Sequence, residues 1–208
     1  MEFFNLNKNS ILVSWNVELN SSLTSLISSY KNQILSLCKD DIKDCVQSIK
    51  SILIIIDLKR TSINEIIEKI KMIDYEKISN HDRIIKVWEI PVCYDLEFAT
   101  DINLLSDIKN LSVRDIIDAH LSKTYDVLSM GFLPGFMYLG KTDKKLHCER
   151  KEKPSLNIRK GSIGLALDQT CIYPRQSPGG WHIIGNSPIE FFNLASKYPC
   201  FSKPGDKI

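Results

Sequence analysis

The sequence predicts an α+β protein in two parts. A small domain over residues 1–83 has the element order β-α-β-β-α-β, and a mainly β domain covers residues 84–208. The main observation is the distribution of glycine and proline. All nine glycines fall at or after Gly131, and seven of the eight prolines lie beyond the same point. The first 130 residues instead carry apolar patterns typical of regular helices and strands.

In the first part, the spacing of apolar residues predicts each element. Short β-rich runs predict strands at residues 10–16, 45–49, 52–57 and 84–92. Apolar residues that recur every three or four positions predict helices at residues 21–38 and 62–73. Ser62 and Glu65 form the pattern of a capping box at the start of the second helix. No catalytic cluster is found here, so a role in folding or docking is expected.

The second part begins with two short helices, predicted at residues 98–110 and 113–122, with Ser112 as an N-cap. A strand is predicted at residues 125–130. From there on, frequent glycine and proline indicate short strands joined by tight turns.

Composition excludes several classes of function. The net charge is +2, from 27 basic and 25 acidic side chains that are scattered along the chain, so neither nucleic acid nor an anionic membrane surface is an expected partner. The longest fully apolar run is residues 52–56, far below the roughly 18 residues of a membrane span. The first ten residues do not have the pattern of a secretory signal.

The six cysteines predict reduced, mostly buried thiols in a cytoplasmic protein. They contain no C-x-x-C pair, so no metal site is expected.

Three glycine-containing segments are candidates for chemistry: GFLPGFMYLG at 131–140, GSIGLALDQTCIYP at 161–174 and SPGGWHIIG at 177–185. In the first, a Pro-Gly turn can present aromatic side chains as a wall. In the third, adjacent glycines leave backbone N–H groups open to a carboxylate or phosphate oxygen. The alternative interpretation is ordinary turn chemistry with aromatic residues in the core. The sequence has no Walker motif, no nucleophile elbow and no zinc-protease motif.

Three polar residues are candidates for catalysis. His120 lies late in a predicted helix, where it is either an acid–base group or a structural histidine. Arg150 lies in a charged loop and can hold a carboxylate in bidentate fashion, unless that loop is simply a solvated turn. Gln169 can polarise a carbonyl or phosphoryl oxygen, or it can serve as a hydrogen-bonding group at a strand edge. His147 and His182 are further candidate acid–base groups.

These segments, in this order and with Leu146, His147 and Arg150 between them, resemble a carboxyltransferase-type family. The family contains the B subunit of bacterial 5-oxoprolinase, subunit 1 of allophanate hydrolase and the kinase-A inhibitor proteins. The resemblance is strong over residues 84–208 and loose before them.

The resemblance implies a cyclophilin-like β-barrel after the small α+β domain. It implies an ATP-dependent complex with A and C subunits that hydrolyses 5-oxo-L-proline to glutamate, in which phosphorylation of the lactam oxygen activates a stable amide. His120, Arg150 and Gln169 would be the catalytic residues. The matching positions for substrate binding are Phe132, Pro134, Gly135, Phe136, Tyr138, Thr170, Tyr173, Pro174, Ser177, Pro178, Gly179, Gly180 and Trp181.

The sequence also departs from the family pattern. Ser155 stands where arginine is common, Arg159 where proline is common, and Asn186 where arginine or histidine is frequent. The chain ends at PGDKI, where the resemblance predicts a further strand. Three functions therefore stay open: a 5-oxoprolinase subunit, an inhibitor that docks on a sensor histidine kinase, and subunit 1 of an allophanate hydrolase.

Overall fold

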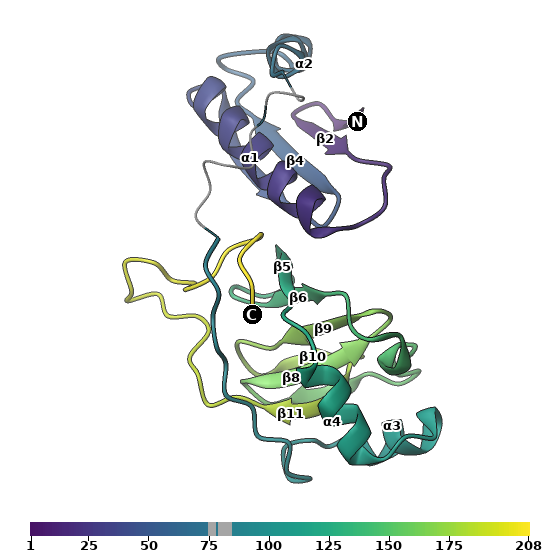
Figure 1. Ribbon diagram of the computed structural model, residues 1–208. Helices are drawn as coiled ribbons and strands as arrows, with labels where there is room; N and C mark the ends of the chain where they lie inside the picture. The colour runs from purple at the N-terminus through teal and green to yellow at the C-terminus, as the bar shows by residue number, and fades with distance from the viewer. Residues whose placement is uncertain (75–77, 79–84) are drawn as a thin grey trace. The chain divides into compact units, whose positions relative to one another are not determined.

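The computed structural model describes residues 1–74, 78 and 85–208, which divide into two compact units, Met1–Ile85 and Lys86–Ile208 (Figure 1). The predicted domain boundary, between residues 83 and 84, falls outside the described residues. The α+β class is confirmed: unit 1 combines helices with a sheet, and unit 2 is mainly β.

Unit 1 is a four-stranded antiparallel sheet in the order β1-β2-β4-β3, with two helices on one face. Its elements are β1 (Glu2–Asn7), β2 (Ser10–Ser14), α1 (Ser21–Leu37), β3 (Ile42–Gln47), β4 (Ser51–Ile56) and α2 (Ile63–Lys71). The alternate residues Ile52, Ile54 and Ile56 are fully buried against the apolar faces of the helices. The predicted capping box of Ser62 and Glu65 is present.

The order of elements in unit 1 differs from the prediction at both ends. β1 precedes the first predicted strand and pairs with β2 along the edge of the sheet. The last predicted strand, at residues 84–92, is not in this sheet. Residue 84 is outside the described part, and residues 86–92 belong to unit 2.

Unit 2 is built on a five-stranded antiparallel sheet in the order β11-β8-β9-β6-β5, with a separate pair formed by β7 and β10. The strands are β5 (Asp126–Met130), β6 (Met137–Gly140), β7 (Ser155–Ile158), β8 (Ser162–Ala166), β9 (Gln169–Ile172), β10 (Ser177–Gly179) and β11 (His182–Asn186). Helices α3 (Ile102–Lys109) and α4 (Val113–Leu121) pack together, and α3 contacts β11 (Figure 1). A short 3-10 helix, η2 (Lys144–Leu146), follows β6.

Two segments outside the named strands link the edges of this sheet. Residues 205–208 run antiparallel to β5, and the Val127 N–H donates to the Asp206 carbonyl at 2.8 Å. Residues 86–88 bond to the same segment, where the Trp88 N–H donates to the Lys207 carbonyl at 2.9 Å. Farther along, Cys93 pairs with Asn186 of β11. Isolated backbone bridges therefore join β5 through residues 205–208 to residues 86–88, and Cys93 to β11, so the segment 86–93 contacts both edges of the open sheet.

The sheet separates two apolar clusters. Because side chains alternate along a strand, Thr170 and Ile172 of β9 face one side, and Gln169 and Cys171 face the other. The first side holds the larger core, with α3, α4 and residues 90–94. The second holds a smaller cluster rich in aromatic rings. Candidate residues can contact one another only if they lie on the same face of this sheet.

Candidate functional site

The aromatic side chains singled out in the sequence converge on the second face of the sheet. The Phe136 ring is at the centre and is only 1% exposed. Its centroid lies 5.5 Å from that of Phe132, 4.8 Å from Tyr138, 4.9 Å from Tyr173 and 6.4 Å from Trp181. Residues from all three candidate segments therefore form one aromatic cluster.

The Pro-Gly turn brings these segments together. Gly135 adopts a φ of +84°, which a side chain would strain, and a Cβ there would lie 3.2 Å from the Pro174 Cβ. The turn thus packs directly against the end of the β9 segment. Next to it, Phe132 has a φ of 70° and is 62% exposed, so its ring forms the solvent-facing edge of the cluster. A non-glycine residue with positive φ is uncommon and is often found at functional sites.

Arg150 lies at the border of the aromatic cluster. Its guanidinium carbon is 5.6 Å from the Trp181 ring centroid, in the range of a cation–π contact. Within residues 1–74, 78 and 85–208, no carboxylate forms an ion pair with Arg150. Beside it, Gly180 has open space where a side chain would be, and the nearest neighbours of a Cβ there are the Lys151 carbonyl oxygen at 3.8 Å and the Arg150 Cβ at 3.9 Å. The site thus combines an apolar wall, a cation and accessible backbone.

An ion pair whose side chains are 12% and 15% exposed fixes the segment that carries Arg150. The Lys151 ammonium lies 2.8 Å from Asp101 Oδ2 and donates to Ser155 Oγ at 2.6 Å. Asp101 Oδ2 also accepts from the Ile183 N–H at 2.7 Å, and the Lys151 N–H donates to the Gly180 carbonyl at 2.8 Å. These bonds join the segment to β11 and to the Gly-Gly turn, so Arg150 is held between anchored neighbours.

His120 lies on the opposite face of the sheet, in the last turn of α4. Its Nδ1 is 2.8 Å from the Tyr94 hydroxyl, and its Nε2 is 3.0 Å from Thr170 Oγ1, which donates to the Gly164 carbonyl. Because that hydroxyl uses its hydrogen on Gly164, it accepts from Nε2–H, and Nδ1 accepts from Tyr94. Burial lowers the pKa of His120 to about 4 and raises that of Tyr94 to about 12, so the ring is neutral at pH 7.

The structure therefore divides the predicted site into two groups. His120 and Thr170 meet each other but not Arg150, because the sheet lies between them. The other predicted residues belong to the aromatic side or to its turns: Phe132, Pro134, Gly135, Phe136, Tyr138, Tyr173, Pro174, Ser177, Pro178, Gly179, Gly180 and Trp181. Gln169 starts β9 and pairs with Ala166 on the aromatic face, at the end of the strand away from Tyr173.

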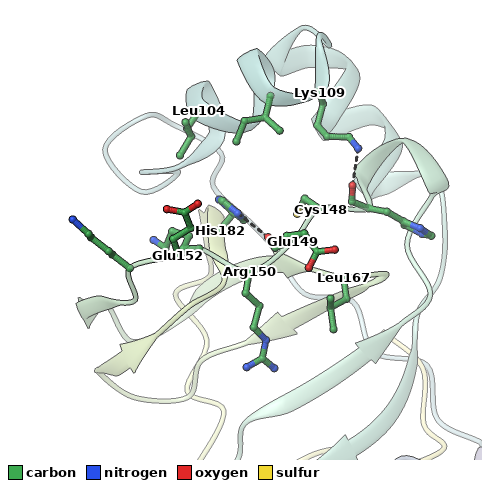
Figure 2. A pocket seen from close by; sticks show the side chains of 12 residues that line it. Leu104, Lys109, Cys148, Glu149, Arg150, Glu152, Leu167 and His182 are labelled. Carbon is green, nitrogen blue, oxygen red and sulfur yellow. Dashed lines mark hydrogen bonds between the residues drawn. The ribbon is translucent and has the colours of Figure 1, made fainter.

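A cleft of about 1050 Å³ lies beside Arg150, between α3 and residues 147–153 (Figure 2). Its walls include side chains that the sequence analysis left out, such as Lys109 and Leu104 of α3 and Lys153 of the charged loop. For the charged loop, the run KEK at 151–153 was the sequence pattern that could have indicated a role in the site. For α3 there was none, because a short amphipathic helix near the start of a domain has the pattern of a simple connector. Tyr94 likewise has no local signal, since only the fold brings it to His120.

Among the described residues, no group of three or more His, Cys, Asp or Glu side chains is arranged to hold a metal ion. In the same residues, no helix combines the length and the apolar character that crossing a membrane requires.

Comparison with protein families decides the identity of the fold. The family model described as carboxyltransferase domain, subdomain C and D, matches residues 1–202. The chain belongs to this family. It is 39% identical to the 5-oxoprolinase B subunit of Bacillus subtilis over 123 residues, and 37% identical to the protein of the same name from Escherichia coli O157:H7 over 120 residues. These matches cover 59% and 58% of this chain, but only 51% and 55% of the relatives, so the chain spans about half the length of these proteins.

Solved structures agree with the family. The crystal structure of TTHA0988 superposes with a TM-score of 0.83 at 24% identity, covering 95% of this chain and 38% of that chain. The urea amidolyase of K. lactis superposes with a TM-score of 0.76 at 16% identity, covering 99% of this chain and 14% of that one. At these identities the likeness shows the fold alone. An uncharacterized protein, PH0987 from Pyrococcus horikoshii, is 33% identical with a TM-score of 0.57, and the match covers 99% of this chain and 94% of that chain.

Proposed function

We propose that the chain is the B subunit of an ATP-dependent 5-oxoprolinase, which acts with A and C subunits in the cytoplasm and opens 5-oxo-L-proline to L-glutamate. Curated relatives that are named as B subunits of 5-oxoprolinase support this assignment at 35–39% identity. The observation that carries it in the structure is the convergence of three separate segments on Arg150 and the aromatic cluster.

The chemistry of the proposed substrate fits this site. 5-Oxo-L-proline is a five-membered lactam with a carboxylate, so it needs an apolar contact for its ring methylenes and a cation for its charge. In this proposal Arg150 offers the cation, and the partly exposed Tyr138 ring, 6.1 Å from the buried Trp181 ring on which Arg150 stacks, offers the apolar contact. ATP would supply the phosphoryl group that activates the lactam oxygen. The chain has no Walker motif, so the proposal assigns the use of ATP to the assembled complex.

In this proposal Arg150 holds the anionic group and Gln169 contacts an oxygen of the reacting amide. For His120, a role in proton transfer stays a prediction. Both of its ring nitrogens are hydrogen-bonded and the ring is neutral, which favours a positioning role for it, joining α4 to β9.

The test is reconstitution with the A and C subunits encoded with this chain, with ATP-dependent glutamate release as the readout. We expect Arg150→Ala to lower kcat/KM about tenfold or more, because a charged hydrogen-bonding group is lost. We expect Gln169→Ala to lower it less. Arg159→Ala is the matched control, since Arg159 also stacks on an aromatic ring, that of Phe98 at 5.8 Å, and pairs with Glu97 at 3.5 Å.

The outcomes separate the alternatives. Absence of glutamate release with any co-encoded partner would remove the proposal. Turnover of allophanate instead would assign the chain to allophanate hydrolysis, and slower autophosphorylation of a sensor kinase on adding the chain would assign it to kinase inhibition.

A further inference from the structure

The Arg150 side chain is long and exposed, so packing in a core does not set the direction of its guanidinium. A cation that holds an anion should be oriented beforehand, because each rotamer that is frozen on binding costs affinity. Two consecutive residues, Trp181 and His182, lie at the two ends of this arginine. Trp181 belongs to the aromatic cluster, whereas His182 faces the cleft between α3 and residues 147–153.

Trp181 provides a fixed surface for the guanidinium. The guanidinium carbon lies 5.6 Å from the Trp181 ring centroid, within the range of a cation–π contact. Trp181 is 4% exposed, and a Cβ on Gly164 of β8 would lie 2.9 Å from the Trp181 Cβ, so the tryptophan packs tightly on the sheet. This contact fixes the charged end of the arginine, but not the backbone from which the side chain departs.

His182 restrains that backbone. The residue is 5% exposed, and its Nε2 lies 3.0 Å from the Glu149 carbonyl oxygen (Figure 2). Nε2 must donate, because a carbonyl oxygen only accepts. The Glu149 carbonyl and the Arg150 N–H belong to one planar peptide unit, so a bond to the oxygen restrains the whole plane and the direction of the Arg150 Cα–Cβ bond.

The peptide unit between Glu149 and Arg150 makes no backbone–backbone hydrogen bond to the described residues. The residues on either side do make them, since the N–H groups of Cys148 and Lys151 donate to carbonyl oxygens of neighbouring segments at 3.1 and 2.8 Å. His182 therefore supplies the hydrogen bond that the backbone lacks between these two anchored residues.

The His182 ring makes no other hydrogen bond to the described part of the chain. Its Nδ1 is buried and has no partner there. The Arg150 side chain extends away from the ring in Figure 2, so His182 does not contact the group that the guanidinium would hold. These contacts favour a positioning role for His182 over the acid–base role that the sequence suggested.

We infer that His182 is a positioning residue for Arg150: its Nε2–H, bonded to the Glu149 carbonyl, sets the direction from which the arginine reaches the Trp181 ring. The inference rests on the proposed function for one premise, that Arg150 holds the anionic group. It places a specific requirement on position 182. The side chain there must carry a donor at the place of Nε2, which glutamine provides and phenylalanine does not.

Nuclear magnetic resonance of the full chain tests the geometry without partner subunits. At about pH 8, where an ordinary histidine is neutral, we expect the ¹⁵N chemical shifts of the His182 ring to report a protonated Nε2 and a bare Nδ1. We also expect the Trp181 ring current to move the δ-proton signals of Arg150 upfield, with these signals assigned by their loss in Arg150→Ala. A ring protonated on Nδ1 in the wild type would overturn the inference, even if no His182 variant folded.

Two substitutions test the hydrogen bond itself. His182→Phe keeps a ring but removes the donor, and we expect it to reduce the upfield displacement of the Arg150 δ-proton signals by about half or more. His182→Gln keeps a donor, so most of the displacement should remain. The δ protons of Arg159, which lies over the Phe98 ring at 5.8 Å, are the matched control and should not respond. Unchanged Arg150 signals in folded His182→Phe, or equal changes in both variants, would contradict the inference.

The reconstituted complex tests the consequence for the reaction. We expect His182→Phe to raise KM for 5-oxo-L-proline about fivefold with kcat nearly unchanged, because a misdirected arginine binds the ground state and the transition state less well by the same amount. His182→Gln should restore KM. In an Arg150→Ala background His182→Phe should have no further effect, because it acts through the arginine. Losses that simply add in the double variant would speak against positioning.

Failure of this inference differs from failure of the proposed function. If the complex releases glutamate but the Arg150 signals do not respond to His182→Phe, the subunit assignment stands and His182 does not position the arginine. If the signals respond as expected but no complex turns the lactam over, the positioning of Arg150 stands and the assignment falls.

Discussion

At the scale of single residues, adjacent glycines at 179 and 180 have opposite surroundings. A Cβ on Gly179 would overlap the Tyr173 hydroxyl and lie 2.9 Å from Ile158 Cδ1, whereas one on Gly180 meets nothing closer than 3.8 Å. Because Tyr173 is only 1% exposed, its ring has no room to move. We therefore expect Gly179→Ala to lower the free energy of unfolding by about 2 kcal/mol.

Gly180→Ala is the control for that substitution. We expect it to change the free energy of unfolding by less than about 0.5 kcal/mol. Urea unfolding followed by circular dichroism measures both. Equal losses in the two variants would contradict the packing that we describe around Tyr173.

His120 predicts a dependence of stability on pH. Its pKa is lowered from the ordinary 6.5 to about 4 by burial. Between these values the unfolded chain binds a proton that the folded chain does not, so stability is fully present above pH 6.5 and falls as the pH drops toward 4. The contribution of His120 to the free energy of unfolding falls by about 2 kcal/mol between pH 7.5 and pH 5.

The measurement is urea unfolding of the wild type and of His120→Gln at several pH values. Other groups titrate in the same range, so the difference between the two proteins is what counts. We expect the wild type to lose more stability than His120→Gln on acidification. Parallel curves would show that His120 is not held neutral.

The residues of the candidate site could be predicted from the sequence only where they share one strand or one turn. Phe136, Tyr138 and Tyr173 lie close to Pro-Gly or Gly-rich turns, and alternation along the strands places them on one face. The pairing of His120 with Tyr94 and Thr170 joins positions 26 and 50 residues away, and no local pattern carries that information. The same holds for Lys109, which reaches the cleft only because α3 packs beside β11.

At the scale of elements, the helices of unit 2 begin in different ways. Ser112 caps α4 and forms a capping box with Asp115, whose N–H donates to the Ser112 hydroxyl at 3.0 Å. Asp101 stands at the same position of α3 but makes no side-chain cap hydrogen bond, because its carboxylate binds Lys151 and the Ile183 N–H instead. α3 therefore begins without a side-chain cap, and the Asp101 carboxylate instead binds the segment that carries Arg150.

Substitutions at Ser112 and Asp101 should therefore lower the free energy of unfolding by different amounts. We expect Ser112→Ala to cost about 1 kcal/mol of unfolding free energy, the usual value of a lost cap. Asp101→Ala should cost more, about 3 kcal/mol, because it leaves the Lys151 ammonium, whose side chain is only 12% exposed, and the Ile183 N–H without their shared acceptor. Thermal or urea unfolding gives both values. A larger loss for Ser112→Ala would mean that the ion pair contributes little.

The elements that were predicted wrongly or missed share a physical cause. β1 is mostly exposed and lies at the edge of its sheet, so its sequence lacks the apolar alternation that marks a half-buried strand. Residues 86–92 are β-rich as expected, but they make a single isolated bridge in unit 2, between Val87 and Lys207. Composition can indicate an extended segment, but not which sheet will supply its hydrogen bonds.

At the scale of the whole molecule, residues 86–88 and 205–208 hold the edges of the unit 2 sheet together through few bonds. Asp206 is 1% exposed and joins these segments: its carboxylate accepts from the Trp88 indole N–H at 3.4 Å and from the Lys203 N–H at 3.1 Å. Its neighbour Lys207 bonds through its backbone to residues 86 and 88, and its side chain makes a partly exposed ion pair with Asp126 at 3.4 Å.

We therefore expect Asp206→Ala to loosen the link between β5 and residues 86–88, because buried donors lose their acceptor at a cost of about 2 kcal/mol. Hydrogen–deuterium exchange with mass spectrometry should show faster exchange at residues 86–88 and 125–127, and little change in β2 and β4, which belong to the other unit. Lys207→Ala should leave exchange nearly unchanged, since a partly exposed ion pair contributes at most about 1 kcal/mol. If Asp206→Ala accelerates exchange equally in both units, the local role that we assign to Asp206 is contradicted.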